Sequence, residues 1–207
     1  MLLRLKHATM SQPPLILGST SCYRRQLLER LGVPFQVMAP TCDEEALKDP
    51  ALQPQQLAEY LAAAKADSIA TNQPQAVVIG SDQVAAYEDT DGWHIIGKPG
   101  TVEKAVAQLA RLSGRTHVLI TAMVVQQGSL IQRHTDITTL TMRTLTTTEL
   151  SRYVAADMPL DCAGAYKLEA RGISLFSSIE SADHSAITGL PLIALTRILS
   201  GFGYAIP

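Results

Sequence analysis

The sequence predicts an α/β protein built on one mixed, twisted sheet with helices around it. Strand-like and helix-like segments alternate along the 207 residues, which is the pattern of α/β folds. Two long β-branched runs, at residues 116–125 and 130–142, are separated only by Gln-Gln-Gly-Ser, so antiparallel pairing is expected in the sheet. Hydrophobic residues make up 46% of the chain and charged residues 17%, which is enough apolar material for a buried core. The length fits one domain, or one domain with a cleft between two lobes.

The elements of the first half follow from apolar runs and from helical spacing. Leu57, Leu61 and Ile69 recur at the spacing of one helix face, within a stretch that begins at a proline. The expected elements are strands at residues 15–17, 35–39 and 76–80 and helices at about 21–31 and 54–71.

The second half begins with a hairpin signal, because Asp91-Gly92 lies between two short apolar runs. Thr146 and Glu149 have the types and spacing of a helix start, and Ser200-Gly201 ends the last helical pattern. The expected elements are strands at 84–87, 94–96, 116–125 and 130–142 and helices at 102–112, 146–156 and 191–199.

Charge and composition exclude several classes of partner. The formal net charge is −2, so no basic field favours an extended nucleic acid. No apolar run reaches about 18 residues, and residues 1–14 lack the pattern of a signal peptide, so we expect a cytoplasmic protein that does not bind a membrane. The three cysteines form no CxxC pair and are interpreted as reduced thiols. Residues 1–13 are interpreted as an extension before a single domain at 14–207, with Met1 and Met10 both open as the first residue.

The stretch LILGSTSCYRR, at residues 15–25, is the first candidate site. A strand that ends in Ser19 and Ser21 at a helix start presents free backbone N–H groups and the positive end of a helix dipole, which favours phosphate. Arg24 and Arg25 add two planar cations that match phosphate oxygens. The alternative at this point is a capped helix with two solvated arginines.

Four further charged residues fall at the ends of expected strands, in short loops or on a helix. Glu44 and Asp82 each follow an expected strand, Lys65 lies in AAAKA, and Lys98 lies in a Gly-Lys-Pro turn. Read singly, Asp82 is consistent with an Asx turn and Lys65 with a solvated helix face. Read together, the two lysines and the two arginines match the negative charge of a nucleoside triphosphate, and the two carboxylates can bind the divalent metal that accompanies it. Walker and Rossmann glycine motifs are absent from the sequence.

The order of the motifs resembles the Maf-like family of nucleotide pyrophosphatases. The motifs are STSxxRRxLL, DE, a helical lysine, GSDQV, GKP, SGRTH, CAGAYKLE and ITGLPLIAL. The resemblance implies a two-lobed Maf-type fold with the active site in the cleft, a homodimer, and hydrolysis between the α and β phosphates with Mg²⁺ or Mn²⁺. It implies that Asp82 is the general base, that Asp82 and Glu44 hold the metal, and that Ser19, Ser21, Arg24, Arg25, Lys65 and Lys98 bind the phosphates.

The subgroup of that family is suggested by Gln83 and Glu169, in GSDQV and AYKLE. These residues are similar to the members that hydrolyse 7-methyl-GTP, whereas dTTP and UTP enzymes have Thr and Gln there. Methylation at N7 makes the guanine ring positive, which favours an aromatic face, assigned to Tyr23, and a carboxylate, assigned to Glu169. A dTTP or UTP pyrophosphatase and a non-hydrolysing nucleotide-binding regulator of cell division are the alternatives.

Overall fold

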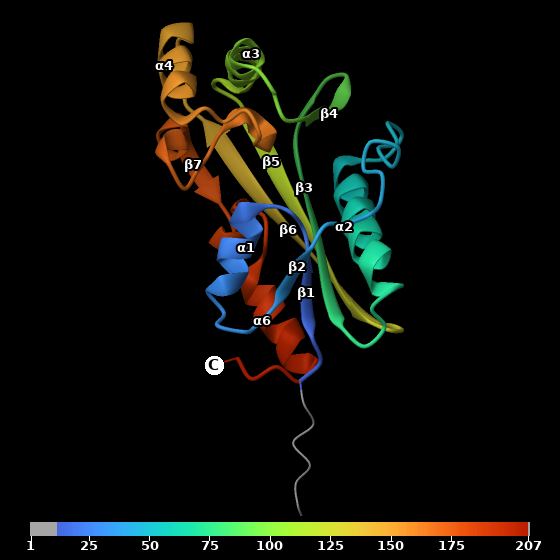
Figure 1. Cartoon of the computed structure of the whole chain (residues 1–207). Helices are drawn as coiled ribbons and strands as arrows, with labels where there is room; N and C mark the ends of the chain where they lie inside the picture. The colour runs from blue at the N-terminus through green and yellow to red at the C-terminus, as the bar shows by residue number, and fades with distance from the viewer. Residues whose placement is uncertain (1–11, 207) are drawn as a thin grey trace, which may run out of the picture.

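A mixed sheet of seven strands forms the centre of the computed structural model, which describes residues 12–206 (Figure 1). The strands are β1 (Leu15–Gly18), β2 (Gln36–Met38), β3 (Val77–Asp89), β4 (Gly92–Ile96), β5 (Thr116–Gln127), β6 (Leu130–Met142) and β7 (Phe176–Glu180). Their order is β2-β1-β3-β5-β6-β7, and β4 pairs with β3. The β1–β2 and β1–β3 pairs are parallel and the other pairs are antiparallel, so the predicted mixed α/β sheet is confirmed.

The helices lie around this sheet (Figure 1). They are α1 (Cys22–Glu29), α2 (Pro54–Ala70), α3 (Val102–Leu112), α4 (Thr147–Asp157), α5 (His184–Ile187) and α6 (Leu192–Gly201), with short 3-10 turns η1 (Ala163–Ala165) and η2 (Arg171–Leu175). The sequence did not predict α5 or β7. Both are short, and β7 reads FSSIE at a sheet edge, where two adjacent serines interrupt the apolar pattern.

The two largest hydrophobic clusters of the described residues lie in different lobes of the molecule. One core contains Leu17, Leu28 and Leu195 from β1, α1 and α6. The other contains Leu109 and Val154 from α3 and α4. The strands β3, β5 and β6 are 13, 12 and 13 residues long, so they run through both lobes and join them. The expected mixed α/β fold with two lobes is therefore observed in the described residues.

The sequence prediction for β3 was wrong in one respect. We expected two strands, at 76–80 and 84–87, with Asp82 between them, but β3 is continuous. Ser81, Asp82 and Gln83 stay in the ladder because each faces a residue of β5 in register. Their polar side chains are accommodated by partners from elsewhere in the chain. Asp82 therefore projects from the middle of a rigid strand and not from a turn.

The helix α2 packs unusually close to β3. A Cβ atom added at Gly80 would lie 2.4 Å from the Ala62 carbonyl oxygen and 2.6 Å from the Ala66 nitrogen. The glycine and the alanines of α2 thus let helix and strand backbones approach, and this places Lys65 of α2 beside Asp82 of β3. Within residues 12–206, no helix combines the length and the apolar character that crossing a membrane would require.

Candidate active site

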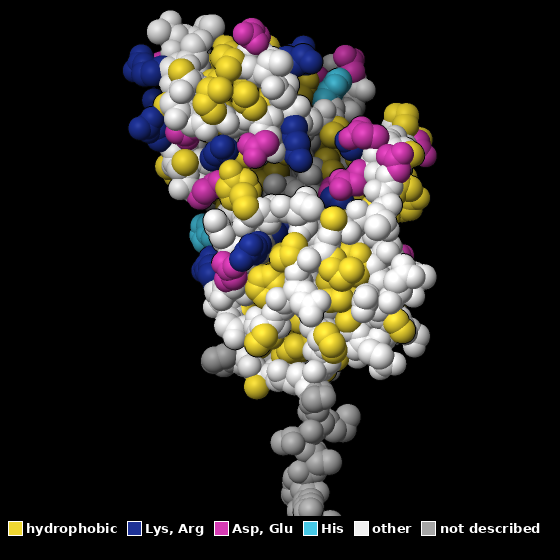
Figure 2. Space-filling view, in the orientation of Figure 1, with side chains coloured by type: hydrophobic (Ala, Val, Ile, Leu, Met, Phe, Trp, Pro, Cys, Tyr) yellow, Lys and Arg dark blue, Asp and Glu magenta, His cyan; other side chains and the backbone are white. Residues whose placement is uncertain are grey.

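A cleft of about 730 Å³ lies between the two lobes. Figure 2 shows the molecule hollowed at this level, with acidic and basic side chains around the hollow. The volume is in the usual range for small-molecule sites, about 300–1,000 Å³. The cleft is lined by most of the residues that the sequence singled out: Ser21, Tyr23, Arg24, Glu44, Lys65, Asp82, Gln83, Lys98 and Glu169.

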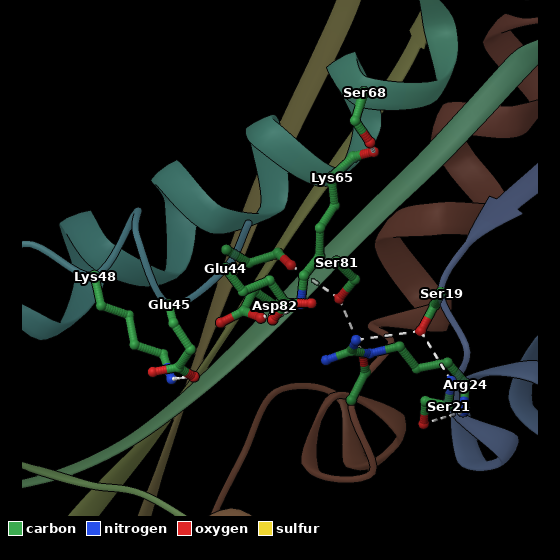
Figure 3. Close-up of polar contacts among 12 residues, drawn as sticks. Ser19, Ser21, Arg24, Glu44, Glu45, Lys48, Lys65, Ser68, Ser81 and Asp82 are labelled. Atoms are coloured by element: carbon green, nitrogen blue, oxygen red, sulfur yellow. Dashed lines mark hydrogen bonds and ion pairs between the residues drawn. The ribbon is translucent and has the colours of Figure 1, made fainter. Parts of the chain in front are cut away.

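Lys65 joins two carboxylates in the middle of the cleft (Figure 3). Its Nζ lies 2.6 Å from Asp82 Oδ1 and 2.8 Å from Glu44 Oε2. The Lys65 and Asp82 side chains are only 7% and 11% exposed, whereas Glu44 is 45% exposed. Lys65 and Asp82 are therefore an almost buried pair, and Glu44 closes over them from the solvent side.

The loop that carries Glu44 is tied to α2 one turn beyond Lys65. Ser68 Oγ accepts a hydrogen bond from the Thr41 N–H at 3.2 Å and donates one to the Lys65 carbonyl at 2.9 Å. The Thr41 hydroxyl donates to the Ser68 carbonyl. These bonds fix the start of the acidic loop against the helix that carries Lys65, and the Glu44 carboxylate lies beside the Lys65 ammonium group (Figure 3).

Arg24 projects into the cleft from α1 and is anchored by the segment before α6. Its Nε donates to the Gly189 carbonyl at 2.9 Å, and Nη1 donates to Ser19 Oγ at 3.4 Å. Burial lowers the pKa of the Arg24 guanidinium, although the carboxylates of Asp82 and Glu44 oppose that change. An arginine nevertheless stays protonated at neutral pH, so Arg24 supplies a fixed positive charge.

Two of the other predicted phosphate ligands, Ser21 and Lys98, line the cleft, and two, Ser19 and Arg25, do not. Ser21 lines the cleft and caps α1 by accepting from the Arg24 N–H. Ser19 is buried behind it and accepts from Arg24, so it contacts the arginine and not the cleft. Lys98 is exposed and lines the opposite side. Arg25 does not line the cleft: it pairs with Glu29 at 3.0 Å on the exposed face of α1.

The cleft is also lined by the residues predicted to recognise the base, Tyr23, Gln83 and Glu169. Burial, and then the neighbouring Cys162, raise the pKa of the Tyr23 hydroxyl, so this ring stays neutral. Gln83 Nε2 donates to Thr121 Oγ1 at 2.9 Å and to the Ala186 carbonyl at 3.0 Å. Because its nitrogen is occupied in this way, Gln83 can offer only its carbonyl oxygen to a ligand.

Sequence reasoning did not identify the residues behind the cleft wall that hold Arg24 in position. Ser81 is fully buried, and its hydroxyl lies 2.9 Å from the Ala122 carbonyl oxygen and 3.0 Å from the Gly189 carbonyl oxygen, so its one proton is shared between these acceptors. The Gly189 carbonyl also accepts from Arg24. Gly189 has φ +111°, and a Cβ there would lie 3.2 Å from Arg24 Nε. The glycine of ITGLPLIAL was the available signal, because glycine is the residue that most readily adopts a positive φ.

Two histidines and a cysteine of potential chemical interest lie outside the charged centre: His117, His184 and Cys22. His117 is buried and its Nε2 is 2.9 Å from the Tyr166 hydroxyl. His184 begins α5 and lines a second hollow, of about 480 Å³, that shares Glu169 with the cleft. Cys22 is exposed at the start of α1 and does not line the cleft.

The donor set at Glu44 and Asp82 fits a hard divalent cation. Both side chains offer carboxylate oxygens, the ligands that Mg²⁺ and Mn²⁺ prefer, and both contact the same ammonium group. The described residues contain no cluster of three or more His, Cys, Asp or Glu side chains arranged to hold a metal, so the protein would supply only these two ligands. A metal at this place would therefore complete its coordination with water and with oxygens of a ligand, as Mg²⁺ does at phosphate sites.

Comparisons with known proteins identify the family to which this chain is similar. A family model described as "Maf-like protein" matches residues 14–202. A 7-methyl-GTP pyrophosphatase of Bdellovibrio bacteriovorus is 50% identical over 92% of this chain and 97% of its own. Proteins of the same name from Xanthomonas campestris (strain 8004) and Polaromonas sp. are 47% and 46% identical, over 94% and 96% of this chain and 99% and 89% of their own.

Proposed function

The chain belongs to the Maf-like family, and we propose that it hydrolyses 7-methyl-GTP to 7-methyl-GMP and pyrophosphate. The observation that carries the proposal is one cleft whose lining includes the cations Arg24, Lys65 and Lys98 and the carboxylates Asp82 and Glu169. The cations match the charge of a triphosphate, and the carboxylate matches a positively charged purine. The relatives named as 7-methyl-GTP pyrophosphatases cover nearly the whole chain, which supports the same substrate here.

The triphosphate would lie across the charged centre of the cleft. Arg24 is held by Gly189 through Nε, so its outer nitrogens are oriented before a ligand arrives. Lys98 approaches from the loop after β4, on the other lobe. Cations placed on both sides of the phosphates stabilise the negative charge that develops on departing pyrophosphate. Ser21 contributes a hydroxyl at the start of α1, whereas Arg25 pairs with Glu29 on the exposed face of that helix and does not line the cleft.

Asp82 is proposed as the general base that accepts a proton from the attacking water. Its position in the middle of β3 fixes the carboxylate, and Oδ1 accepts from Lys65. This leaves Oδ2 to orient a water toward the α-phosphorus. Because an ionised aspartate is a weak base, a divalent metal held by Asp82 and Glu44 would lower the pKa of water and neutralise phosphate charge when bound.

The purine would lie toward Tyr23, Gln83 and Glu169. Glu169 offers only hydrogen-bond acceptors, its two carboxylate oxygens. Gln83 likewise offers only its carbonyl oxygen, because its nitrogen donates to the Ala186 carbonyl. The guanine edge carries N–H donors that match acceptors, and the Tyr23 ring offers a face to a cationic base. This combination favours 7-methylguanine over uracil or thymine, which offer one donor between two acceptors.

A panel of triphosphates tests the proposal. Pyrophosphate release is measured from 7-methyl-GTP, GTP, UTP and dTTP with Mg²⁺ or Mn²⁺. We expect kcat/KM to be largest for 7-methyl-GTP. Turnover of UTP or dTTP with none of 7-methyl-GTP would favour the alternative substrates, and tight binding without any pyrophosphate would favour a regulator.

The cellular setting is part of the same proposal. Cys22, Cys42 and Cys162 are free thiols, which fits a reducing cytoplasm. The homodimer rests on the family resemblance alone, and light scattering coupled to size exclusion would measure it. Residues 1–13 remain a proposed extension before the domain, and residues 1–11 lie outside the described part of the chain.

A further inference from the structure

Lys65 occupies the position that a divalent cation would take. Its ammonium group contacts both carboxylates that fit a metal, at 2.8 Å for Glu44 and 2.6 Å for Asp82. Lys65 is 95% buried, since its relative exposure is 5%, so the ammonium is shielded from water at this point. A metal ion that bound the same two carboxylates would face this positive charge at close range.

The charges at the centre of the cleft oppose the entry of a free metal ion. Arg24 and Lys65 supply two positive charges, and Glu44 and Asp82 supply two negative ones. This inner group therefore has no net negative charge to offer a divalent cation. Two like unit charges about 4 Å apart repel by about 1 kcal/mol in water and about 4 kcal/mol near a protein surface. The repulsion is larger for a divalent ion, so the free metal should bind weakly.

A triphosphate removes this obstacle. It brings about four negative charges, which give Lys65 a new partner and give the metal additional oxygen ligands. Lysine has a long flexible stem and a compact charge, so its ammonium can move from one acceptor to another without moving α2. The hydrogen bonds of Ser68 with Thr41 and with the Lys65 carbonyl hold the backbone of α2 and of the acidic loop in place while the ammonium changes partner.

We propose that Lys65 is an internal cation that holds Glu44 and Asp82 in the substrate-free protein and transfers to the phosphates as metal and nucleotide enter together. The inference rests on the proposed function and adds to it an order of binding. The true substrate is the metal–nucleotide complex, and the protein alone has little affinity for the metal.

Titration of Mn²⁺ with the full chain, followed by electron paramagnetic resonance, tests the inference. The first comparison uses the wild-type protein with and without a 7-methyl-GTP analogue whose α–β bridging oxygen is replaced by methylene. We expect Mn²⁺ to bind at least about tenfold more tightly with the analogue, as a coupling of about 1.4 kcal/mol or more would give. Equal Mn²⁺ affinity in the two states would overturn the inference.

The second comparison needs no nucleotide. In Lys65→Met the two carboxylates lose the ammonium, so Mn²⁺ should bind at least about tenfold more tightly than to wild type. Lys104→Met is the control, because Lys104 is exposed on α3 and does not line the cleft, so the Mn²⁺ affinity of this variant should not change. A folded Lys65→Met protein that binds Mn²⁺ no better than wild type would contradict the inference.

The two proposals fail in distinguishable ways. If Lys65→Met does not fold, Lys65→Gln provides the same loss of charge with a polar side chain, and the wild-type comparison stands independently. If the wild-type protein binds no 7-methyl-GTP analogue, the proposed substrate is wrong, and the nucleotide-free titrations of wild type and Lys65→Met still decide the role of Lys65.

Discussion

Arg24 Nε donates a hydrogen bond to the carbonyl of Gly189 at 2.9 Å, although 165 residues separate the two along the chain. The same carbonyl accepts from Ser81 of β3. One backbone oxygen thus joins α1, the central strand and the segment before α6. The guanidinium is thereby oriented into the cleft before any ligand is present, and its neighbour Arg25 is not.

The adjacent arginines provide a matched test. Arg24→Ala should lower kcat/KM by about 10–100-fold, because a charge-assisted hydrogen bond contributes about 1.5–3 kcal/mol. Arg25→Ala should stay within about twofold of wild type, since an exposed ion pair contributes only about 0–1 kcal/mol to stability. Steady-state kinetics of the two variants measures both. A larger loss in Arg25→Ala than in Arg24→Ala would reverse our assignment.

Asp82→Asn should remove the base but keep the shape of the cleft. Loss of a positioned base lowers kcat by about 10²–10⁴, and Lys65 retains Glu44 as a partner. Asp67→Asn, at an exposed position of α2, is the control and should keep wild-type turnover. Pyrophosphate release is the measurement. An Asp82→Asn enzyme with nearly full activity would exclude Asp82 as the base.

Glu169→Gln should change selectivity more than turnover. The amide has one donor group where the carboxylate had only acceptors, so the ratio of kcat/KM for 7-methyl-GTP over UTP should fall about tenfold or more. Glu180→Gln, on the exposed end of β7, should leave the ratio unchanged. Retention of the wild-type ratio in Glu169→Gln would remove our account of base recognition.

The sequence could predict which residue types form the site, but not how they are held. Asp82, Lys65 and Glu44 were identified from their motifs, and the structure brings them together. Arg24 and Arg25 could not be separated, because the orientation of Arg24 depends on the Gly189 carbonyl, 165 residues away along the chain. Contacts over more than a hundred residues leave no local pattern in a single sequence.

The fold was predicted best where hydrophobic periodicity was strong. The long strands β5 and β6 and the helices α2 and α3 were found close to their bounds. The break expected in β3 was wrong because polar residues normally signal a strand end. Here Ser81 and Gln83 satisfy their side chains through Ala122 and Thr121, which periodicity cannot reveal.

Gly80→Ala should destabilise the protein and weaken catalysis together. The new Cβ would lie 2.4 Å from the Ala62 carbonyl oxygen, so α2 must move away from β3 and take Lys65 with it. Overpacking of this kind lowers the free energy of unfolding by about 1–3 kcal/mol. Gly201→Ala is the control, because nothing lies within 4 Å of its added Cβ. Urea unfolding measures the effect, and equal stability of the two variants would contradict the close approach.

His117 should make the fold sensitive to acid. Burial lowers the pKa of His117 to about 4 from its ordinary 6.5, so between these values the unfolded chain binds the proton and the folded protein does not. Stability from this group is therefore full above pH 6.5 and is lost as the pH falls toward 4, by up to about 1.4 kcal/mol per pH unit. Between pH 7.5 and pH 5, wild type should lose about 2 kcal/mol more than His117→Gln. Parallel losses in both proteins would show that His117 is not the responsible group.

The products of one reaction test the central claim most directly. The full-length protein is incubated with 7-methyl-GTP and Mn²⁺ or Mg²⁺, the metal is removed with a chelator, and the products are identified by phosphorus NMR. Cleavage between the α and β phosphates predicts pyrophosphate and 7-methyl-GMP in equal amounts, and neither product above background from Asp82→Asn. Release of inorganic phosphate with 7-methyl-GDP, or unchanged 7-methyl-GTP with either metal, would contradict the account.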